Sequence, residues 1–360
     1  MNYQELCSYQ NLELAFKKAR KGKTTKDYVI AFEKDMKENL TNLRYELLLH
    51  SYRPKPLEIF IIRDPKTRTI SKSDFRDRVV HHALCNVIAP TFEKHFIHDS
   101  YANQVGKGAL KAISRFDEFT RIASNNYTKK IFVLKADIRK YFENVNHNVL
   151  LELLQAQIKD KKILWLIKLI LSNHATKVSN KGMPLGNLTS QFFANVYLHE
   201  LDLFVKHIIK AKYYIRYVDD FIIINKSKNK LKQFKKEINK FLLEKLDLEL
   251  HPEKSRIIQL QKGINFLGFR IFPQYKLLVK KNLRKFKAKL NNYSENFPKG
   301  CSDYDKIYDF LEGWTAYAKY ASTYKLRKEI FQSIEPVFEN QMSTKEINRY
   351  LKTIKNHKKS

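Results

Sequence analysis

The chain has few of the residues that interrupt regular structure. Its 360 residues include 9 glycines and 9 prolines, and these do not gather with serine into a linker. We therefore expect the subdomains to pack continuously. The three cysteines (Cys7, Cys85 and Cys301) are odd in number and far apart, in no metal-ligand spacing. Such cysteines are typical of reduced thiols that are buried as small hydrophobic side chains in a cytosolic protein.

Long apolar runs are also absent. The most apolar segment, ILWLIKLILSNHA from Ile163, carries Lys168 and is shorter than the roughly 18–20 residues that a membrane span requires. The N-terminal residues MNYQELCSYQ lack the basic stretch and apolar core of a signal peptide. The sequence therefore predicts a cytoplasmic protein that has no membrane partner.

Negative charge is scarce. There are 37 Asp and Glu against 68 Lys and Arg, which gives a net charge of +31, and 43% of the residues are hydrophobic, as in a globular protein. A net charge of magnitude roughly 2–8 is enough for solubility, so the excess indicates a polyanionic partner. Nucleic acid is the first candidate; an anionic membrane surface, the second, is disfavoured because no segment has the length and apolar character of a membrane span.

The pattern of apolar residues predicts a mixture of helices and strands. Helices are expected within 10–50 and over 75–96, the latter ending near Pro90 or shortly beyond it. A β region is expected over 57–73, with a type I turn at Asp64-Pro65. Further predicted elements are an amphipathic helix over 108–123, a strand over 129–137, helices at about 148–157 and 161–172, one long helix over 188–209, a hairpin over 213–225, a basic helix over 226–246, short strands within 248–260 and 264–273, and basic helices from about 280. This order describes an α+β layer and not a doubly wound sheet.

Three aspartates stand out because apolar strands flank them. Asp219 and Asp220 lie within YYIRYVDDFIIIN, and Asp137 ends the apolar strand IFVLKAD. Buried carboxylates are costly unless a positive charge meets them. Few, hard oxygen ligands are what Mg²⁺ prefers, and a pair of such ions supports phosphoryl transfer. A solvated turn is the alternative for an isolated Asp-Asp pair.

At this point the sequence resembles the reverse transcriptases of bacterial retroelements. YVDD and the preceding ADIRKYFENVNH are similar to motifs C and A of that family, and GMPLGNLTSQFFANVYLHELD is similar to motif B. RDPKTRTISKSDFRDRVVHHAL resembles the fingers segment of the family, and HPEKS resembles motif D. INFLGFRI resembles motif E, and LEGWTAYAKYA resembles the thumb helix. All of them occur in the order of the family, between about residues 10 and 335.

The resemblance implies an α+β, right-hand polymerase fold. Its expected parts are an N-terminal helical extension over 1–50, fingers over 51–130, a palm with an antiparallel sheet and helices over 131–275, and a helical thumb with a basic tail over 276–360. Few residues follow the thumb, so a full group II intron protein with a maturase or endonuclease domain is not expected.

The resemblance also implies the catalytic residues. Asp137, Asp219 and Asp220 match the three family aspartates, and the backbone carbonyl of Ile138 would add one more oxygen ligand. These groups would bind two Mg²⁺ ions, with Mn²⁺ as a substitute.

A second set of residues is expected to bind the incoming deoxynucleotide. Phe142 matches the aromatic steric gate against a ribose 2′-OH; a helix residue in the core is the alternative. Arg63 and Arg68 flank the fingers turn and are assigned to the triphosphate, with Lys66 as a substitute for Arg63 and a solvated hairpin as the alternative. Lys254 matches the motif D lysine, a candidate proton donor to pyrophosphate; a solvated loop lysine is the alternative.

The basic region from Lys280 is expected to follow the template–primer backbone. This predicted track comprises Lys280, Lys281, Arg284, Lys287 and, at helical spacing further on, Trp314. Aromatic residues at that spacing more often belong to a core. The lysine-rich segment 225–236 has a solvated helix face as its alternative.

Motif B departs from the commoner family pattern. Most bacterial members carry Gln-Gly-x-x-x-Ser-Pro, whereas this chain has Leu185-Gly186 and, six residues after Leu185, Gln191. Leu185 and Gly186 complete the expected nucleotide-binding set. The LGNLTSQ form resembles the reverse transcriptases of diversity-generating retroelements, which copy a template RNA with errors opposite adenine. An aliphatic side chain at 185 supplies no hydrogen bond near the nascent pair; a packing variant is the alternative.

The resemblance implies template RNA, an RNA/DNA primer duplex, deoxynucleotides and a small basic accessory protein oligomer as partners. It also implies a bacterial or phage-encoded protein. The alternatives are a retron, phage-defence or group II-like reverse transcriptase, and a catalytically idle RNA-binding scaffold.

Overall fold

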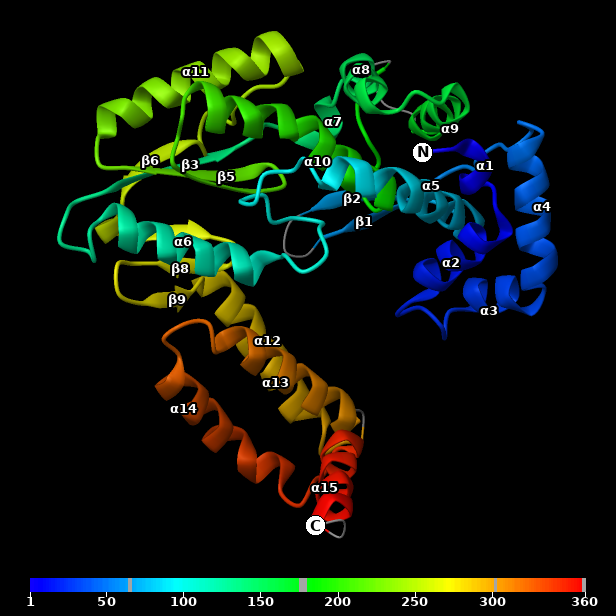
Figure 1. Ribbon diagram of the computed structural model, residues 1–360. Coiled ribbons are helices and arrows are strands. Elements are labelled where there is room, and N and C mark those ends of the chain that lie inside the picture. Colours follow the sequence, from blue (N-terminus) through cyan, green and yellow to red (C-terminus); the bar gives the residue numbers. More distant parts are fainter. Residues whose placement is uncertain (64–66, 175–179, 301–302, 358–360) are drawn as a thin grey trace. The chain divides into compact units, whose positions relative to one another are not determined.

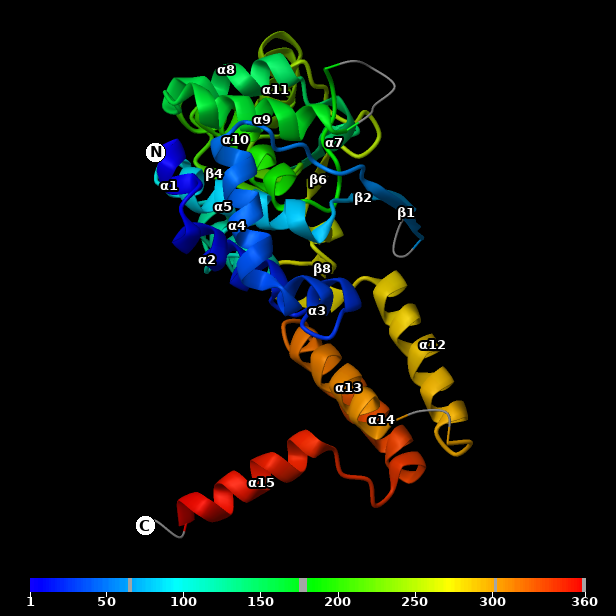
Figure 2. The ribbon, with the colours of Figure 1, turned by 90° about the vertical axis from the view of Figure 1, so that its right-hand side faces the viewer.

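A computed structural model describes residues 1–63, 67–174, 180–300 and 303–357, without the side chains of 351–357 (Figures 1 and 2). The chain forms two compact units, Met1–Phe119 with Phe132–Ile257, and Thr120–Ile131 with Ile258–Ser360. The predicted four-part division stays a prediction. The predicted turn at Asp64-Pro65, Lys66 and Cys301 lie outside the described residues.

A four-stranded sheet organises the first unit, in the order β4-β5-β3-β6. β5 is antiparallel to both of its neighbours, and Asp137 at the end of β3 is paired with Asp220 at the start of β5. Side chains alternate between the two faces of a sheet. Leu134 and its partner Ile223 therefore share one face, while Asp137 and Asp220 belong to the other. The strands are β3 (Phe132–Asp137), β4 (Tyr213–Tyr217), β5 (Asp220–Asn225) and β6 (Arg256–Gln259).

Helices cover the face that carries Leu134 and Ile223. α11 (Lys228–Leu246) contacts β3 and β5, and α10 (Leu188–Leu203) packs beside it (Figure 1). The predicted long helix over 188–209 is present, but its last turn, η1 (Phe204–Ile208), is π-helical and follows α10 without a break. The remaining helices between β3 and α10 are α7 (Tyr141–Asn144), α8 (His147–Gln157) and α9 (Lys161–Ser172).

The N-terminal helices gather around a long helix, α5 (Phe75–Glu93). Phe75 at its start contacts the rings of Phe16 and Phe32, with centroids 6.0 and 5.2 Å away. α5 ends shortly beyond Pro90, as predicted from the sequence. The helices that contact it are α1 (Tyr3–Leu6), α2 (Tyr9–Arg20) and α3 (Asp27–Lys34), α4 (Met36–Leu48) packs on α2 and α3, and α6 spans Ala109–Ala123.

A separate two-stranded hairpin lies between α4 and α5 in the chain. β1 (Glu58–Ile62) pairs antiparallel with β2 (Arg68–Lys72), and every residue of β1 is exposed. β2 is fixed to the rest of the first unit by its Ser71 N–H, which donates to the carbonyl of Leu185 at 2.9 Å.

The second unit combines a small sheet with helices. The predicted strand over 264–273 is a tight hairpin, β7 (Ile264–Phe266) and β8 (Phe269–Ile271), joined by Leu267 and Gly268 with φ of 45° and 92°. Positive φ at both positions suits a two-residue turn. β9 (Lys276–Leu278) completes the sheet. The other elements are η2 (Leu260–Lys262), α12 (Lys280–Asn296), α13 (Tyr304–Ala318), α14 (Tyr324–Ile334), η3 (Glu335–Phe338) and α15 (Thr344–His357). Within the described ranges, no helix is both long and apolar enough to cross a membrane.

Candidate active site

The three predicted catalytic aspartates meet at one end of the sheet. Asp137 is the last residue of β3, and it is paired across the sheet with Asp220. Asp219 lies directly before Asp220, in the two-residue turn that joins β4 to β5. The sheet register therefore brings together carboxylates that are more than 80 residues apart in the sequence.

Lysine side chains compensate two of these carboxylates. Lys254 Nζ lies 2.6 Å from Asp137 Oδ2, and Lys135 Nζ lies 3.5 Å from Asp220 Oδ1. Lys254 is held near Asp137 by its own loop, because the His251 N–H donates to the Asp137 carbonyl at 2.7 Å. The predicted motif D lysine thus contacts a predicted catalytic carboxylate directly.

Asp219 has less compensation. Burial, followed by the negative charges of Asp220 and Asp137, raises the pKa of Asp219 to about 6. The positive charge of Arg68 acts in the opposite direction, so Arg68 lies within electrostatic range of this carboxylate. A carboxyl group whose pKa approaches neutrality is one that a cation would stabilise in its charged form.

A buried ion pair holds the turn that carries Asp219. Val218 has φ of 55°, a left-handed conformation that is strained for a β-branched residue. Its carbonyl accepts a hydrogen bond from Arg216 Nη1 at 3.2 Å. Arg216 is fully buried, and its guanidinium binds Asp202 through Nε–Oδ1 at 2.7 Å and Nη2–Oδ2 at 2.6 Å.

Sequence reasoning missed this pair. Arg216 lies in the middle of the apolar strand YYIRY, and Asp202 lies near the end of the apolar helix α10. A charge within an apolar element is a signal of a buried partner, but it does not say which partner. Asp202 also accepts a hydrogen bond from the hydroxyl of Tyr214 at 2.7 Å, so this one carboxylate binds two side chains of β4.

The oxygen donors at this site suit a divalent cation that arrives with substrate. In the part of the chain that the structure describes, no group of three or more His, Cys, Asp or Glu could hold a metal ion by itself. Mg²⁺ commonly binds one or two carboxylates together with substrate phosphates and water. Asp137 and Asp220 can supply the carboxylates. Ile138 forms an isolated β-bridge with Leu250, and the hydrogen bonds of this bridge use the Asp137 carbonyl and the Arg139 N–H. The Ile138 carbonyl takes no part in them.

The predicted motif B loop lies against β2 and the residues that follow it. The Leu185 carbonyl accepts from Ser71, and the Asn187 side chain accepts from the Ser73 N–H at 3.1 Å. Gly186 has φ of 119°, and a Cβ at this position would lie 2.9 Å from the Ile70 side chain. Only glycine combines this backbone with this close approach. Leu185 itself is half-buried.

The remaining predicted nucleotide-binding residues are accessible to different degrees. Phe142 is half-buried and makes an edge contact with the Tyr141 ring, with centroids 5.3 Å apart. Its carbonyl accepts from the Met183 N–H at 2.7 Å, which connects the Phe142 backbone to the segment before Leu185. Arg63 and Arg68 are exposed on the hairpin.

Comparison of the sequence with known protein families identifies the family of this chain. The family described as reverse transcriptase (RNA-dependent DNA polymerase) matches residues 61–271, which is more than half of the chain. The chain belongs to the reverse transcriptase family. The matched range contains every predicted catalytic and nucleotide-binding residue.

Several proteins are similar to this reverse transcriptase along much of its length. It is 25% identical to Protein YkfC of Escherichia coli over 268 residues, which cover 64% of this chain and 70% of that protein. It is 24% identical to the group II intron-encoded protein LtrA of Lactococcus lactis over 366 residues, which cover 80% of this chain and 58% of that protein. The chain thus spans little more than half the length of LtrA.

A solved structure supports the fold. A telomerase from Candida albicans, solved with a fragment of telomeric RNA, aligns with a TM-score of 0.50 and 13% identity, over 84% of this chain and 58% of that one. At this identity the likeness shows the fold alone. The predicted α+β, right-hand polymerase fold of this reverse transcriptase is confirmed.

The second unit of this reverse transcriptase contains the predicted nucleic-acid track. Lys280, Lys281, Arg284 and Lys287 are exposed on α12. Trp314 is instead 9% exposed, with its ring stacked on Phe286 at a centroid distance of 3.8 Å. This burial favours packing between α12 and α13 over the predicted contact with nucleic acid.

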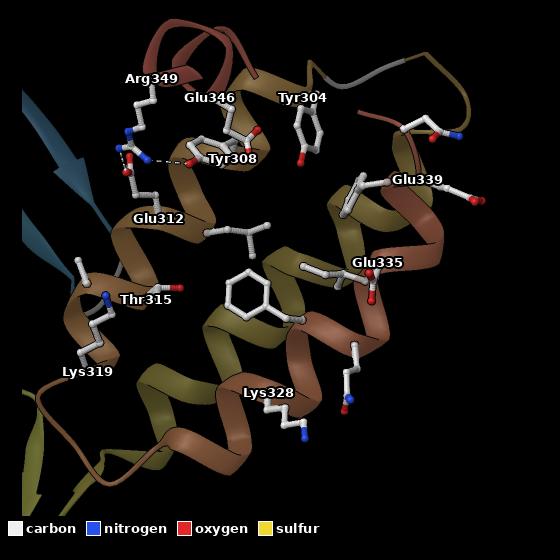
Figure 3. A pocket seen from close by; sticks show the side chains of 17 residues that line it. Tyr304, Tyr308, Glu312, Thr315, Lys319, Lys328, Glu335, Glu339, Glu346 and Arg349 are labelled. Atoms are coloured by element: carbon white, nitrogen blue, oxygen red, sulfur yellow. Dashed lines mark hydrogen bonds and ion pairs between the residues drawn. The ribbon is translucent and has the colours of Figure 1, made fainter. Parts of the chain in front are cut away.

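A cavity of about 880 Å³ lies between α13, α14 and α15 (Figure 3). An ion pair between Glu312 and Arg349 lies at its edge, where Arg349 Nη1 also donates to the Tyr308 hydroxyl at 2.9 Å. None of the three aspartates lines this cavity, so it is not part of the candidate active site.

Proposed function

We propose that this reverse transcriptase copies an RNA template into cDNA by two-metal nucleotidyl transfer. The observation that carries the proposal is the meeting of Asp137, Asp219 and Asp220 at one end of the sheet, in a chain of the reverse transcriptase family. Two Mg²⁺ ions bound by these carboxylates and the Ile138 carbonyl would activate the primer 3′ hydroxyl and stabilise the pyrophosphate leaving group.

The side chains around the aspartates have separate tasks in this proposal. Arg63 and Arg68 bind the triphosphate of the incoming deoxynucleotide, because guanidinium groups suit phosphate oxygens. Phe142 excludes a ribose 2′-OH. Lys254 compensates Asp137 in the absence of substrate and donates a proton to pyrophosphate when the nucleotide is bound.

Arg216 and Asp202 are positioning residues. Since Arg216 binds the Val218 carbonyl, their ion pair holds the turn that carries Asp219 in its left-handed conformation. A rigid support of this kind suits a reaction that requires aligned groups.

A primer-extension assay on an RNA template tests the proposal. Asp219→Asn and Asp137→Asn each remove one ligand charge and keep the shape of the side chain, so each is expected to abolish extension while RNA binding remains. Asp27→Asn on the exposed start of α3 is the matched control and should extend the primer normally. Extension at the wild-type rate by both active-site variants would contradict the two-metal assignment, and RNA binding without extension by the wild type would favour the idle scaffold.

The narrower proposal is an error-prone enzyme of a diversity-generating retroelement. The segment LGNLTSQ, with Leu185 in place of the commoner Gln, supports it. The similarity to LtrA, a group II intron-encoded protein, favours a group II-like reverse transcriptase as the second candidate. The neighbouring DNA discriminates between them, since a near-repeat that differs mainly at adenines accompanies only the first.

This proposal includes a cytoplasmic location and a small basic accessory protein that helps to hold the template RNA. With a net charge of +31 on the polymerase, a contact with a basic protein should be polar or bridged by RNA. A pull-down with and without nuclease separates the two routes. Full, processive synthesis by the polymerase alone would show that no accessory protein is required.

A further inference from the structure

One flank of α11 carries lysines and no acidic residue. The buried stripe of this helix packs against the first unit and comprises Leu231, Phe234, Ile238, Leu242 and Leu246. At 3.6 residues per turn, the two acids of the helix, Glu237 and Glu244, fall on one side of that stripe. The opposite side, called the lysine flank here, carries Lys228, Lys232, Lys235, Lys236 and Lys240.

The charges of the lysine flank are poorly compensated. Lys240 reaches Glu244 only at 3.8 Å. Across the described parts of the chain, no ion pair or hydrogen bond involves Lys232 or Lys236. Glu249, in the segment that follows the helix, is already paired with Arg139 at 2.6 Å. By contrast, Lys345 and Arg349 on α15 both have carboxylate partners.

The lysine flank also borders a hollow in the surface. A groove of about 800 Å³ lies between it and the segment 249–252, and four lysines line it together with the two acids Glu244 and Glu249. Lys232, Lys236 and Lys240 line this groove at intervals of four residues, which is about 6 Å along a helix. A row of ammonium groups at such a spacing can meet successive phosphates of one strand.

The groove is on the opposite side of the sheet from the active site. α11 packs on β3 and β5, where Leu134 and Ile223 belong to the same buried core as Leu231 and Ile238 of the helix. Asp137 and Asp220 point to the other face, because side chains alternate along a strand. The stretch of nucleic acid that is being copied in the active site therefore cannot also lie on the lysine flank.

We propose that the lysine flank binds the phosphodiester backbone of RNA outside the stretch that is being copied. The proposal rests on the proposed function in assuming that RNA is the polyanion. The groove favours a nucleic acid because four lysines line it, and two of them, Lys232 and Lys236, have no ion pair in the described parts of the chain. Such a site would hold the flanking RNA while the active site advances along the template.

Two RNA substrates and two charge variants test this site. The substrates are a short primer–template duplex and the same duplex with a long RNA extension beyond the template. The variant K232Q/K236Q/K240Q removes three lysines of the flank but keeps Lys235, which donates to the Ser255 carbonyl at 2.5 Å. The control K226Q/K230Q/K245Q removes three exposed lysines outside the flank.

The flank variant is expected to bind the extended RNA about tenfold or more weakly at moderate salt, with a slope of log affinity against log salt that is smaller by roughly two to three. Its binding and extension of the short duplex should match those of the wild type. An equal loss in the control variant, or an equal loss on the short duplex, would overturn the proposal. So would unchanged RNA affinity together with weaker binding of polyglutamate, which would assign the flank to an acidic protein. A wild type that binds but extends no primer would overturn the proposed polymerase and leave this test intact.

Discussion

Replacing Asp219 by Asn is expected to stabilise the metal-free protein at neutral pH. Burial and the neighbouring carboxylates raise the pKa of Asp219 to about 6, against about 3.9 for an unperturbed aspartate. The folded chain therefore binds this proton more tightly than the unfolded chain, and stability falls as the pH rises from about 4 to about 6. Above pH 6 Asp219 is ionised in both states, and the loss in the free energy of unfolding reaches its full size. A pKa difference of about 2 makes this loss at most about 3 kcal/mol.

Thermal unfolding in EDTA measures this effect. One kcal/mol shifts the Tm of a domain of this size by roughly 2–4 °C, so the variant should melt up to about 10 °C higher than the wild type at about pH 7.5. At about pH 5 the wild-type carboxyl is mostly protonated in the folded chain, and the gain should fall by about half. Excess Mg²⁺ should then raise the Tm of the wild type more than that of the variant.

Asp137→Asn is the matched comparison. Its carboxylate is paired with Lys254 at 2.6 Å, so the substitution removes a compensated charge and leaves an ammonium group without its partner. We expect no gain in Tm from this variant. If both substitutions raise the Tm equally, or if the gain from Asp219→Asn does not shrink at the lower pH, uncompensated charge on Asp219 is not the cause.

Three further substitutions test other parts of the site. Phe142→Ala should admit ribonucleotides, and it should lower the ratio of kcat/KM for a deoxynucleotide to that for its ribonucleotide; an unchanged ratio would make Phe142 a core residue. Leu185→Gln adds one hydrogen-bonding group, worth about 0.5–1.5 kcal/mol, and should reduce errors opposite adenine roughly two- to tenfold, with the other three template bases as internal controls in cDNA sequencing. Asp202→Ala leaves Arg216 buried without its carboxylate and should lower the free energy of unfolding by about 3–5 kcal/mol in urea denaturation; a loss below about 1 kcal/mol would contradict this account.

The sequence predicts the part of the site whose position follows directly from the strands that carry it. Asp219 and Asp220 lie between two runs that are rich in aromatic and β-branched residues, and two such runs joined by a short turn are typical of a hairpin. Asp137 ends another apolar strand, and its pairing with Asp220 requires only that the strands be neighbours.

The contacts that the sequence did not predict depend on tertiary packing. A lysine 117 residues from Asp137 reaches it because of the loop before β6, and no local pattern specifies that distance. Trp314 lies at the helical spacing expected of an exposed aromatic row, but spacing alone does not say which face of a helix is covered. Phe286 on α12 covers it. The π-helical turn after Leu203 likewise has no marker in the apolar pattern.

The buried pair of Arg216 and Asp202 makes docking of the active-site hairpin an all-or-none event. While the hairpin is undocked, both side chains remain hydrated. A half-docked hairpin would bury a guanidinium or a carboxylate without its partner, at a cost of several kcal/mol in folding free energy. Partly docked chains should therefore be rare at equilibrium. In a purified sample, the fraction of molecules that bind nucleotide should then equal the folded fraction, and lost activity after storage should appear as unfolded protein and not as a folded, inactive form.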